Sequence, residues 1–242
     1  MLKLANNTKP RANGAFLTKY MVPKKPKPLI VLFDLDSTLT TAETLDLLAK
    51  EKGIEAKVKK ITTETMEGKK PVAELFANKL KMLAPSKKDR TLIRRIALHN
   101  LSSEALDLVR KLSHYDHIRL GILSMHFRET VEDVGAFIGC DPTLCFGLDI
   151  QHDEHGNYTG YAPDQLMAQE GGKGLIVAEV KKLNPDTIVV HIGDSVTDLT
   201  TQGKADLFIG FGGVTVREKV KKTAKHYAMD FDEVANLLQK YL

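Results

Sequence analysis

The sequence is poor in the residue types that build several common kinds of site. Its 242 residues include no tryptophan and two cysteines, Cys140 and Cys145. Two cysteines without a histidine at a zinc-binding spacing argue against both a disulfide framework and a zinc site. We expect both to be reduced thiols, with Cys140 packed as a small hydrophobic side chain.

Long apolar runs and aromatic-rich basic stretches are also missing. The longest apolar runs, such as 187–192, have the length of a strand, whereas a helix needs about 20 apolar residues to cross a bilayer. The net charge is +4, and the basic stretches at 87–90 and 219–225 lack the interleaved aromatic side chains of a stacking platform. We therefore expect neither a membrane nor a nucleic acid as partner, since a solvated surface or a small anionic substrate accounts for the charge.

The first 28 residues contain no acidic residue and no apolar stretch long enough for a secretory signal. They fit either a transit peptide or a basic N-terminal arm. We favour an arm formed by residues 1–28, and we expect the protein to be cytoplasmic. Closely spaced prolines between Pro23 and Pro28 disfavour a helix, so ordered structure is expected to start at Leu29.

What the chain does contain is an alternation of strand-like and helix-like segments. Leu29–Phe33 is an unbroken apolar run, typical of a strand buried on both faces. The other predicted elements are strands at 118–123, 187–192 and 207–209, helices at 128–138, 173–183 and from Thr197, and two helical segments near the C-terminus. This order predicts an α/β fold: a Rossmann-like parallel sheet core, built from 29–40 and 112–242, with helices on both faces. A Gly156-Asn157 turn predicts a β-hairpin at 151–161 that extends the sheet.

One segment of the chain shows only helical periodicity. From Ala42 to about Lys111, apolar residues recur every three to four positions, and no strand-like run interrupts them. The recurring positions include Leu45, Leu48, Val58, Ile61, Val72, Leu75, Phe76, Leu80 and Leu83. We assign residues 41–111 to a helical insert, at the small end of domain sizes.

Two acidic residues follow the first predicted strand directly. Ligands of open α/β sheets bind beyond the carboxyl ends of the strands, so these positions are candidate site residues. The carboxylates of Asp34 and Asp36 would repel each other without a proton or cation between them. Mg²⁺ is such a cation, because it takes oxygen ligands from one or two carboxylates, from phosphate and from water. The competing interpretation is that either aspartate caps a helix.

A second acidic pair, Asp194 and Asp198, follows the strand at 187–192 after Gly193. Spaced four apart, these side chains would face the same way at a helix start. One carboxylate could then bind a metal, and the other could orient a ligand or a lysine. A capped helix start explains this segment equally well.

Ser124 follows the predicted strand at 118–123, shortly before the predicted helix at 128–138, and Lys173 lies at the start of another predicted helix. A hydroxyl beside the backbone N–H groups of a helix N-terminus can hold a phosphate, and Lys173 would add a point charge. Taken alone, Ser124 is as readily a helix cap, and Lys173 is as readily a solvated surface residue.

Taken together, these residues resemble the motifs of the haloacid dehalogenase superfamily. Its phosphatases show Asp-x-Asp, then Ser or Thr, then Lys, then an acidic pair, in this chain order. The sequence is similar in more detail to the phosphoserine phosphatase family, especially its eukaryotic members. The matching segments are Phe33–Leu39, Glu43–Ala49, Met66–Gly68, Glu170–Gly174 and Ala205–Gly213, within a likeness that runs from Leu29 to Leu242. The resemblance implies that the helical insert is a cap on the Rossmann-like core.

The resemblance also implies Mg²⁺-dependent hydrolysis of O-phosphoserine to serine and phosphate, a step of serine biosynthesis, through an aspartyl-phosphate intermediate. Asp34 would be the nucleophile, and Asp36 would act first as an acid and then as a base. The Asp34 carboxylate, the Asp36 backbone carbonyl and Asp194 would hold the metal, with Asp198 supporting them.

Other positions would bind the substrate, a small phosphorylated metabolite. By the same resemblance, the phosphate-binding residues are Ser124, Met125 through its N–H, and Lys173, and the substrate-binding residues are Glu43, Met66, Lys79 and Thr197. Glu43 would meet the substrate ammonium and Lys79 its carboxylate.

The chain departs from the family pattern at positions near the substrate. Lys79 stands where the family has Arg, and Lys cannot reproduce a bidentate grip on a carboxylate. Met125 and His126 stand where the family has two glycines, so a second hypothesis keeps the mechanism but gives it another small phosphomonoester. A third is a binding or regulatory homologue with weak catalysis, against which the intact Asp34 and Asp36 argue. The oligomeric state is left open, a homodimer being one option.

Overall fold

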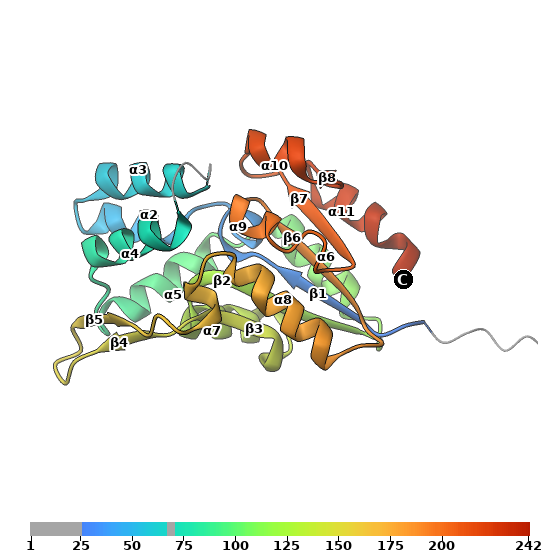
Figure 1. Cartoon of the computed structure of the whole chain (residues 1–242), viewed down its shortest axis with the longest axis horizontal. Coiled ribbons are helices and arrows are strands. Elements are labelled where there is room, and N and C mark those ends of the chain that lie inside the picture. The colour runs from blue at the N-terminus through green and yellow to red at the C-terminus, as the bar shows by residue number, and fades with distance from the viewer. Residues whose placement is uncertain (1–25, 67–70) are drawn as a thin grey trace, which may run out of the picture.

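A six-stranded sheet forms the centre of the computed structural model, which describes residues 26–66 and 71–242 (Figure 1). All neighbouring strands run parallel, in the order β3-β2-β1-β6-β7-β8. The strands are β1 (Leu29–Phe33), β2 (Ile118–Phe127), β3 (Cys145–Leu148), β6 (Ile188–Gly193), β7 (Leu207–Phe211) and β8 (Tyr227–Ala228). The predicted α/β fold with a parallel sheet is confirmed, whereas most of the predicted arm lies outside the described residues.

β1 lies in the middle of the sheet, and its apolar sequence suits that position. It pairs with β2 on one side and with β6 on the other, so that Phe33 lies opposite both Ile122 and Ile192. All five of its residues are buried. Successive side chains of a strand point to opposite faces, so those of β1 enter two apolar clusters, one on each face of the sheet.

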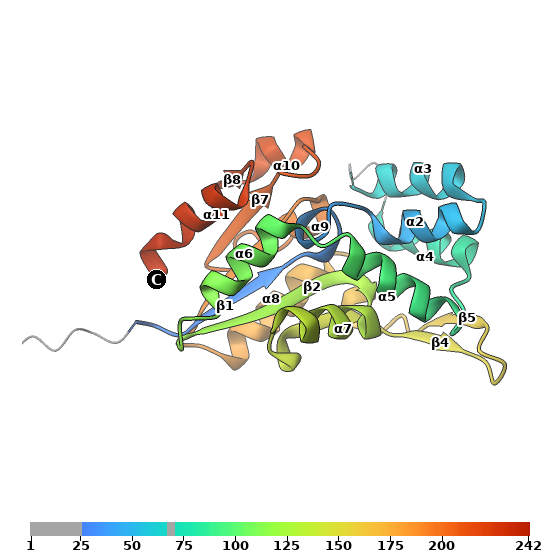
Figure 2. The same cartoon turned by 180° about the vertical axis from the view of Figure 1, so that it is seen from behind.

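Helices cover both faces of the sheet, as predicted. Three helices pack against the face that Figure 2 shows from the front, and α8 packs against the opposite face, seen in front of the sheet in Figure 1. Two shorter helices, α9 and α10, follow β6 and β7. The bounds are α6 (Ser103–Leu112), α7 (Arg128–Ile138), α11 (Phe231–Leu238), α8 (Gly172–Leu183), α9 (Val196–Leu199) and α10 (Glu218–Thr223).

Besides α6, which covers the sheet, four helices lie between β1 and β2 in the described part of the chain, in the segment where periodicity predicted a helical insert. They are α2 (Thr44–Glu51), α3 (Glu55–Met66), α4 (Val72–Leu83) and α5 (Asp89–His99). α2, α3 and α4 pack together as a cap beyond the carboxyl ends of the strands, around buried Leu48, Val58 and Leu80 (Figure 1). The boundaries of the cap at 41–111 stay a prediction.

The predicted hairpin at 151–161 forms, but not where we expected it. Its strands, β4 (Ile150–His152) and β5 (Tyr158–Tyr161), make a separate two-stranded antiparallel sheet instead of extending the main sheet. The Gly156 carbonyl accepts a hydrogen bond from Lys87 N, and His152 Nε2 lies 2.9 Å from the Pro85 carbonyl oxygen. The hairpin therefore contacts the segment between α4 and α5, which explains its departure from the sheet edge.

The strand predicted at 118–123 is also longer than expected. β2 continues to Phe127, with a register shift against β3 between Leu123 and Phe127. Ser124 thus lies within an irregular strand end, and the helix predicted at 128–138 begins at Arg128.

Both cysteines are free and buried, and Cys140 belongs to the apolar cluster on the α7 face, as predicted. Within the described residues, no helix combines the length and apolarity that a bilayer crossing requires.

Candidate active site

Three buried carboxylates meet where β1 and β6 end. Asp34 follows β1, Asp194 follows β6, and Asp198 lies in α9. Each offers an oxygen within 4.8 Å of the others. The two strands run side by side with Phe33 opposite Ile192, so the residues that follow them emerge together. The structure thus brings together three aspartates that the sequence analysis singled out.

Lys173, in the first turn of α8, joins two of these carboxylates. Its Nζ lies 2.7 Å from Asp34 Oδ1 and 2.6 Å from Asp198 Oδ1. Burial by itself would lower the pKa of Lys173, but the charges of Asp198 and Asp34 outweigh burial and raise it. Burial would likewise raise the pKa of Asp198, yet Lys173 and His191 hold it below its usual value. Both shifts favour the charged forms, so Lys173 and Asp198 form a buried ion pair.

Asp198 is held in place by its neighbours. Its Oδ2 accepts hydrogen bonds from Ser195 N at 2.9 Å and from Ser195 Oγ at 2.6 Å, and the bond from Ser195 N belongs to a capping box at the start of α9. Gly193 lies so close that a Cβ there would overlap Asp198. With its oxygens engaged by Lys173 and Ser195, Asp198 is suited to orienting the lysine.

One carboxylate oxygen of Asp194 lacks a hydrogen-bond partner among the described residues, and this bears on metal binding. Its Oδ2 accepts a hydrogen bond from Arg217 Nε at 2.6 Å, but its buried Oδ1 has no hydrogen-bond partner among the described residues. Burial raises the pKa of Asp194 to about 7, although Arg217 opposes the rise. The pKa of Asp34 is also raised, by burial and then by the charge of Asp198. A buried oxygen without a partner, close to a second carboxylate, fits a divalent cation that prefers oxygen ligands.

Asp36 lies in the turn after β1 (Leu35–Leu39), where Ser37 has a φ of 56°. The Asp36 carboxylate points to the start of α2, because its Oδ1 accepts hydrogen bonds from Thr44 N at 3.2 Å and Thr44 Oγ1 at 2.9 Å. Burial raises the pKa of Asp36 to about 6, against the Thr44 hydrogen bonds. A carboxyl group with a pKa near the operating pH can both give and take a proton.

The irregular end of β2 supplies a third wall of the site. Ser124 is buried, and its Oγ accepts a hydrogen bond from His126 N at 3.3 Å. His126 Nδ1 in turn accepts from Phe127 N at 2.7 Å, immediately before α7 begins. Burial, and then the charge of Lys79, lower the pKa of His126 to about 3. His126 is therefore neutral and serves to hold the strand end, with Met125 beside it.

On the cap side, Lys79 is the cation that the sequence placed near the substrate. Its Nζ lies 2.9 Å from Asp46 Oδ1 and donates to Thr62 Oγ1 at 2.7 Å. Asp46 and Thr62 were not among the residues predicted for the site. The signal that could have found them is the helical spacing that put Lys79 on the buried face of α4, since a buried lysine requires an acidic partner.

Arg217 is the other site residue that the sequence prediction missed. It bridges core and cap, because its Nη2 donates to Glu43 Oε1 at 2.9 Å while its Nε donates to Asp194. Glu43 also accepts a hydrogen bond from Ser37 Oγ at 2.9 Å. Burial and the nearby charge of Asp36 raise the pKa of Glu43. Arg217 lies in the loop after β7. The rule that ligands bind beyond the carboxyl ends of the strands, which selected Asp34 and Asp194, would therefore have selected this loop as well.

Most of the predicted side chains face one small cavity of about 40 Å³. It brings together Asp34, Asp36, Glu43, Lys79, Ser124, Met125, Lys173 and Thr197. The Thr197 hydroxyl lies 2.8 Å from Ser195 Oγ. Met66 ends α3, and its side chain lies outside the described part of the structure.

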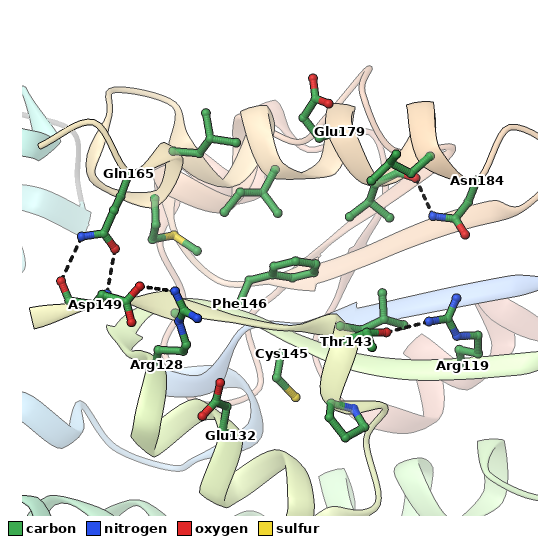
Figure 3. Close-up of a pocket in the computed structure, with 18 residues that line it drawn as sticks. Arg119, Arg128, Glu132, Thr143, Cys145, Phe146, Asp149, Gln165, Glu179 and Asn184 are labelled. Atoms are coloured by element: carbon green, nitrogen blue, oxygen red, sulfur yellow. Dashed lines mark hydrogen bonds and ion pairs between the residues drawn. The ribbon is translucent and has the colours of Figure 1, made fainter. Parts of the chain in front are cut away.

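A larger hollow, of about 680 Å³, lies elsewhere, between the sheet edge at β3 and α8 (Figure 3). Phe146, Val180 and Leu183 give it apolar walls, and its Arg128 is paired with Asp149. None of the three clustered carboxylates lines it. The chemistry of the side chains, and not the size of the cavity, identifies the candidate active site.

Known proteins resemble this chain in sequence. A sequence profile of the haloacid dehalogenase-like hydrolases matches residues 31–201. The phosphoserine phosphatase of Rattus norvegicus is 34% identical over 212 residues, which cover 87% of this chain and 93% of that protein. The phosphoserine phosphatase of Methanocaldococcus jannaschii is 30% identical over 189 residues, which cover 76% and 86% of the two chains.

Solved structures agree with the sequence matches. The structure described as the phospho-aspartyl intermediate analogue of phosphoserine phosphatase superposes with a TM-score of 0.74 at 26% identity, covering 88% of this chain and 99% of that one. A substrate-bound phosphoserine phosphatase complex superposes with the same TM-score, identity and coverage. The chain thus belongs to the haloacid dehalogenase-like hydrolases, and it is a hydrolase of phosphoric monoesters.

Proposed function

We propose that this protein is a Mg²⁺-dependent phosphatase of the cytoplasm that hydrolyses O-phosphoserine to serine and phosphate, through an aspartyl-phosphate on Asp34, in serine biosynthesis. The observation that carries the proposal is the buried group of Asp34, Lys173 and Asp198 beside Asp194. The relatives named phosphoserine phosphatase, which cover most of the chain, support the choice of substrate.

Asp34 is the nucleophile in this proposal. Its Oδ1 accepts hydrogen bonds from Leu35 N and Lys173, which fix the carboxylate and leave Oδ2 for the attack on phosphorus. As the Asp34–phosphorus bond forms, the bond to the alcohol oxygen breaks, and protonated Asp36 gives its proton to that oxygen. Asp36 then takes a proton from the water that attacks phosphorus, which releases phosphate and restores Asp34.

The remaining residues bind the substrate. Ser124, the N–H of Met125, and Lys173 would hold phosphoryl oxygens, and Thr197 would lie near the phosphate and the water. On the cap, Glu43 would meet the substrate ammonium, Lys79 its carboxylate, and Met66 would pack against its carbon chain. These roles follow from the cavity that the described side chains line, Met66 excepted, and from the family resemblance.

A divalent metal fits this site because of the unpartnered Asp194 Oδ1 near Asp34. The Asp34 carboxylate, the Asp36 backbone carbonyl and Asp194 would hold it. When bound, Mg²⁺ would neutralise negative charge on the transferring phosphoryl group.

Phosphate release from a panel of small phosphomonoesters tests the function. We expect turnover of O-phosphoserine with Mg²⁺, loss of turnover in excess chelator, and poor turnover with Ca²⁺, which takes more ligands at longer distances. Asp34→Asn should fold, as judged by circular dichroism, and should release no phosphate, because an amide is not a nucleophile. Full activity in excess chelator would contradict the metal assignment, and substantial turnover by Asp34→Asn would contradict the covalent mechanism.

A further inference from the structure

Lys79 is the cation on the leaving-group side of the cavity, and the cap already supplies it with a counter-charge. Only 5% of the residue is exposed. Of its three N–H donors, one points to Asp46 Oδ1 at 2.9 Å and another to Thr62 Oγ1 at 2.7 Å. A substrate carboxylate could therefore gain one hydrogen bond from Lys79 at most without displacing a partner.

The contacts of Lys79 form a closed triangle. The Thr62 hydroxyl donates to Asp46 Oδ1 at 2.6 Å while it accepts from Lys79. The three residues come from α2, α3 and α4, the three packed helices of the cap. Each member holds the other two, so the ammonium cannot turn to the substrate without breaking hydrogen bonds that are buried and costly to lose.

Carboxyl groups outnumber the cations around this part of the cavity. Asp36 and Glu43 line it with Lys79, and Asp46 lies directly behind the lysine. Arg217 is shared between Glu43 and Asp194. The carboxyl oxygens of Asp36 and Glu43 can accept hydrogen bonds from a substrate ammonium, whereas a substrate carboxylate would meet a lysine whose charge Asp46 has largely neutralised.

We propose that Asp46 is a specificity-determining residue that acts through Lys79. By pairing with the lysine it weakens the recognition of a substrate carboxylate, so the substrate class is phosphate esters of small amino alcohols, with or without a carboxylate. O-phosphoserine and phosphoethanolamine are both members of this class. The inference rests on the proposed function of the same site.

The test measures one quantity, the specificity ratio, which is kcat/KM for O-phosphoserine divided by kcat/KM for phosphoethanolamine. In the parent enzyme the ratio should lie within about tenfold of unity, because the net gain from the carboxylate is small. Asp46→Asn keeps the shape and the hydrogen bond from Thr62 but removes the charge. It should raise the ratio roughly ten- to a hundredfold, the effect of one charge-assisted hydrogen bond.

A matched control removes a negative charge from the same helix but outside the cavity. Glu51 is the exposed last residue of α2, and Glu51→Gln should leave the specificity ratio where it is. Lys79→Met should lower the ratio, because Asp46 would then repel the carboxylate. The double variant Asp46→Asn/Lys79→Met should return the ratio close to the parent value, since both charges are gone.

Product inhibition of the parent enzyme gives a second measurement that needs no variant. L-serine and ethanolamine should inhibit with inhibition constants within about tenfold of each other. Hydrolysis of neither ester would overturn the proposed function itself. If both esters are hydrolysed, the phosphatase function stands, and any of three results would then overturn the role of Asp46. These are a parent specificity ratio above about a hundred, L-serine binding more than about a hundredfold tighter than ethanolamine, and a specificity ratio that Asp46→Asn leaves unchanged.

Discussion

Burial decides the protonation states of the single side chains around the cavity. It raises the pKa of Asp36 to about 6 and that of Asp194 to about 7, and it lowers the pKa of His126 to about 3. In each case the uncharged form is favoured, because charge is costly to remove from water. Asp36 is thereby ready to donate a proton, whereas His126 is unable to act as an acid near neutral pH.

The acid role of Asp36 predicts a dependence on the leaving group. Asp36→Asn should lose much more activity on an alkyl phosphate such as O-phosphoserine than on p-nitrophenyl phosphate, whose leaving group needs little protonation. General acid catalysis contributes roughly a hundred- to ten-thousandfold, which sets the expected gap. Steady-state kcat/KM for the two substrates measures it. An equal loss on both would remove Asp36 from the acid role.

His126 predicts a pH effect on stability. The pKa of His126 in the folded protein, about 3, lies below the ordinary value of 6.5. The unfolding free energy that the neutral imidazole contributes is therefore complete above pH 6.5 and is lost as the pH falls towards 3. Between pH 6.5 and 5 the parent should lose about 2 kcal/mol of unfolding free energy from this group. His126→Asn can still accept from Phe127 N but does not titrate. Its stability deficit relative to the parent should therefore shrink by about that amount at pH 5 compared with pH 8, measured by urea unfolding.

The turn between β6 and α9 is the local element on which the acidic cluster depends. Gly193 ends β6, and a Cβ at this position would lie 2.6 Å from Asp198 Oδ1. Asp198 cannot retreat, because Ser195 and Lys173 hold it from the other sides. The turn therefore couples the glycine to the position of Lys173.

Gly193→Ala should consequently damage both stability and activity. Overpacking of this kind costs about 1 to 3 kcal/mol, and a displaced Lys173 should lower kcat roughly a hundredfold. Thermal unfolding and phosphate release measure the two effects. If the variant were as active as the parent, Asp198 would not be the support that holds Lys173 in place.

Among the polar contacts that join the cap to the core in the described residues, two come from core loops that lie far along the chain from β1. Arg217 connects the core to Glu43 at the base of the cap, and Glu170 Oε2 accepts a hydrogen bond from Val72 N at the start of α4. The links lie on different loops, after β7 and before α8. They hold the cap against the cavity in the structure described here.

Arg217→Met tests the first of these links. Removing the guanidinium leaves Glu43 and Asp194 without their shared cation, so kcat/KM should fall roughly ten- to a hundredfold, the effect of a lost charge-assisted pair. The Mg²⁺ concentration for half-maximal activity should fall as well, because Arg217 no longer competes for Asp194. Arg217→Lys keeps the charge and should leave that concentration closer to the parent value. A higher Mg²⁺ requirement in Arg217→Met would show that the arginine supports metal binding instead of opposing it.

The amino-acid sequence by itself determined the fold class and the positions of the acidic pairs. The apolar run of β1 predicted a strand buried on both faces, and the rule that ligands bind beyond strand ends selected Asp34 and Asp194. Helical periodicity predicted an insert where α2 to α5 are found. These features are local, because each depends on residues adjacent in the chain and on the regular spacing of a strand or helix.

Only the tertiary structure decided which charges meet. Arg217 lies 174 positions from Glu43, and Lys79 receives its partners from two other helices. A sequence pattern shows which face of a helix is apolar, but the polar groups that meet across helices depend on how the helices are rotated and packed. The charge balance beside the leaving group, and with it the preference among substrates, is therefore a property of the packed cap and core.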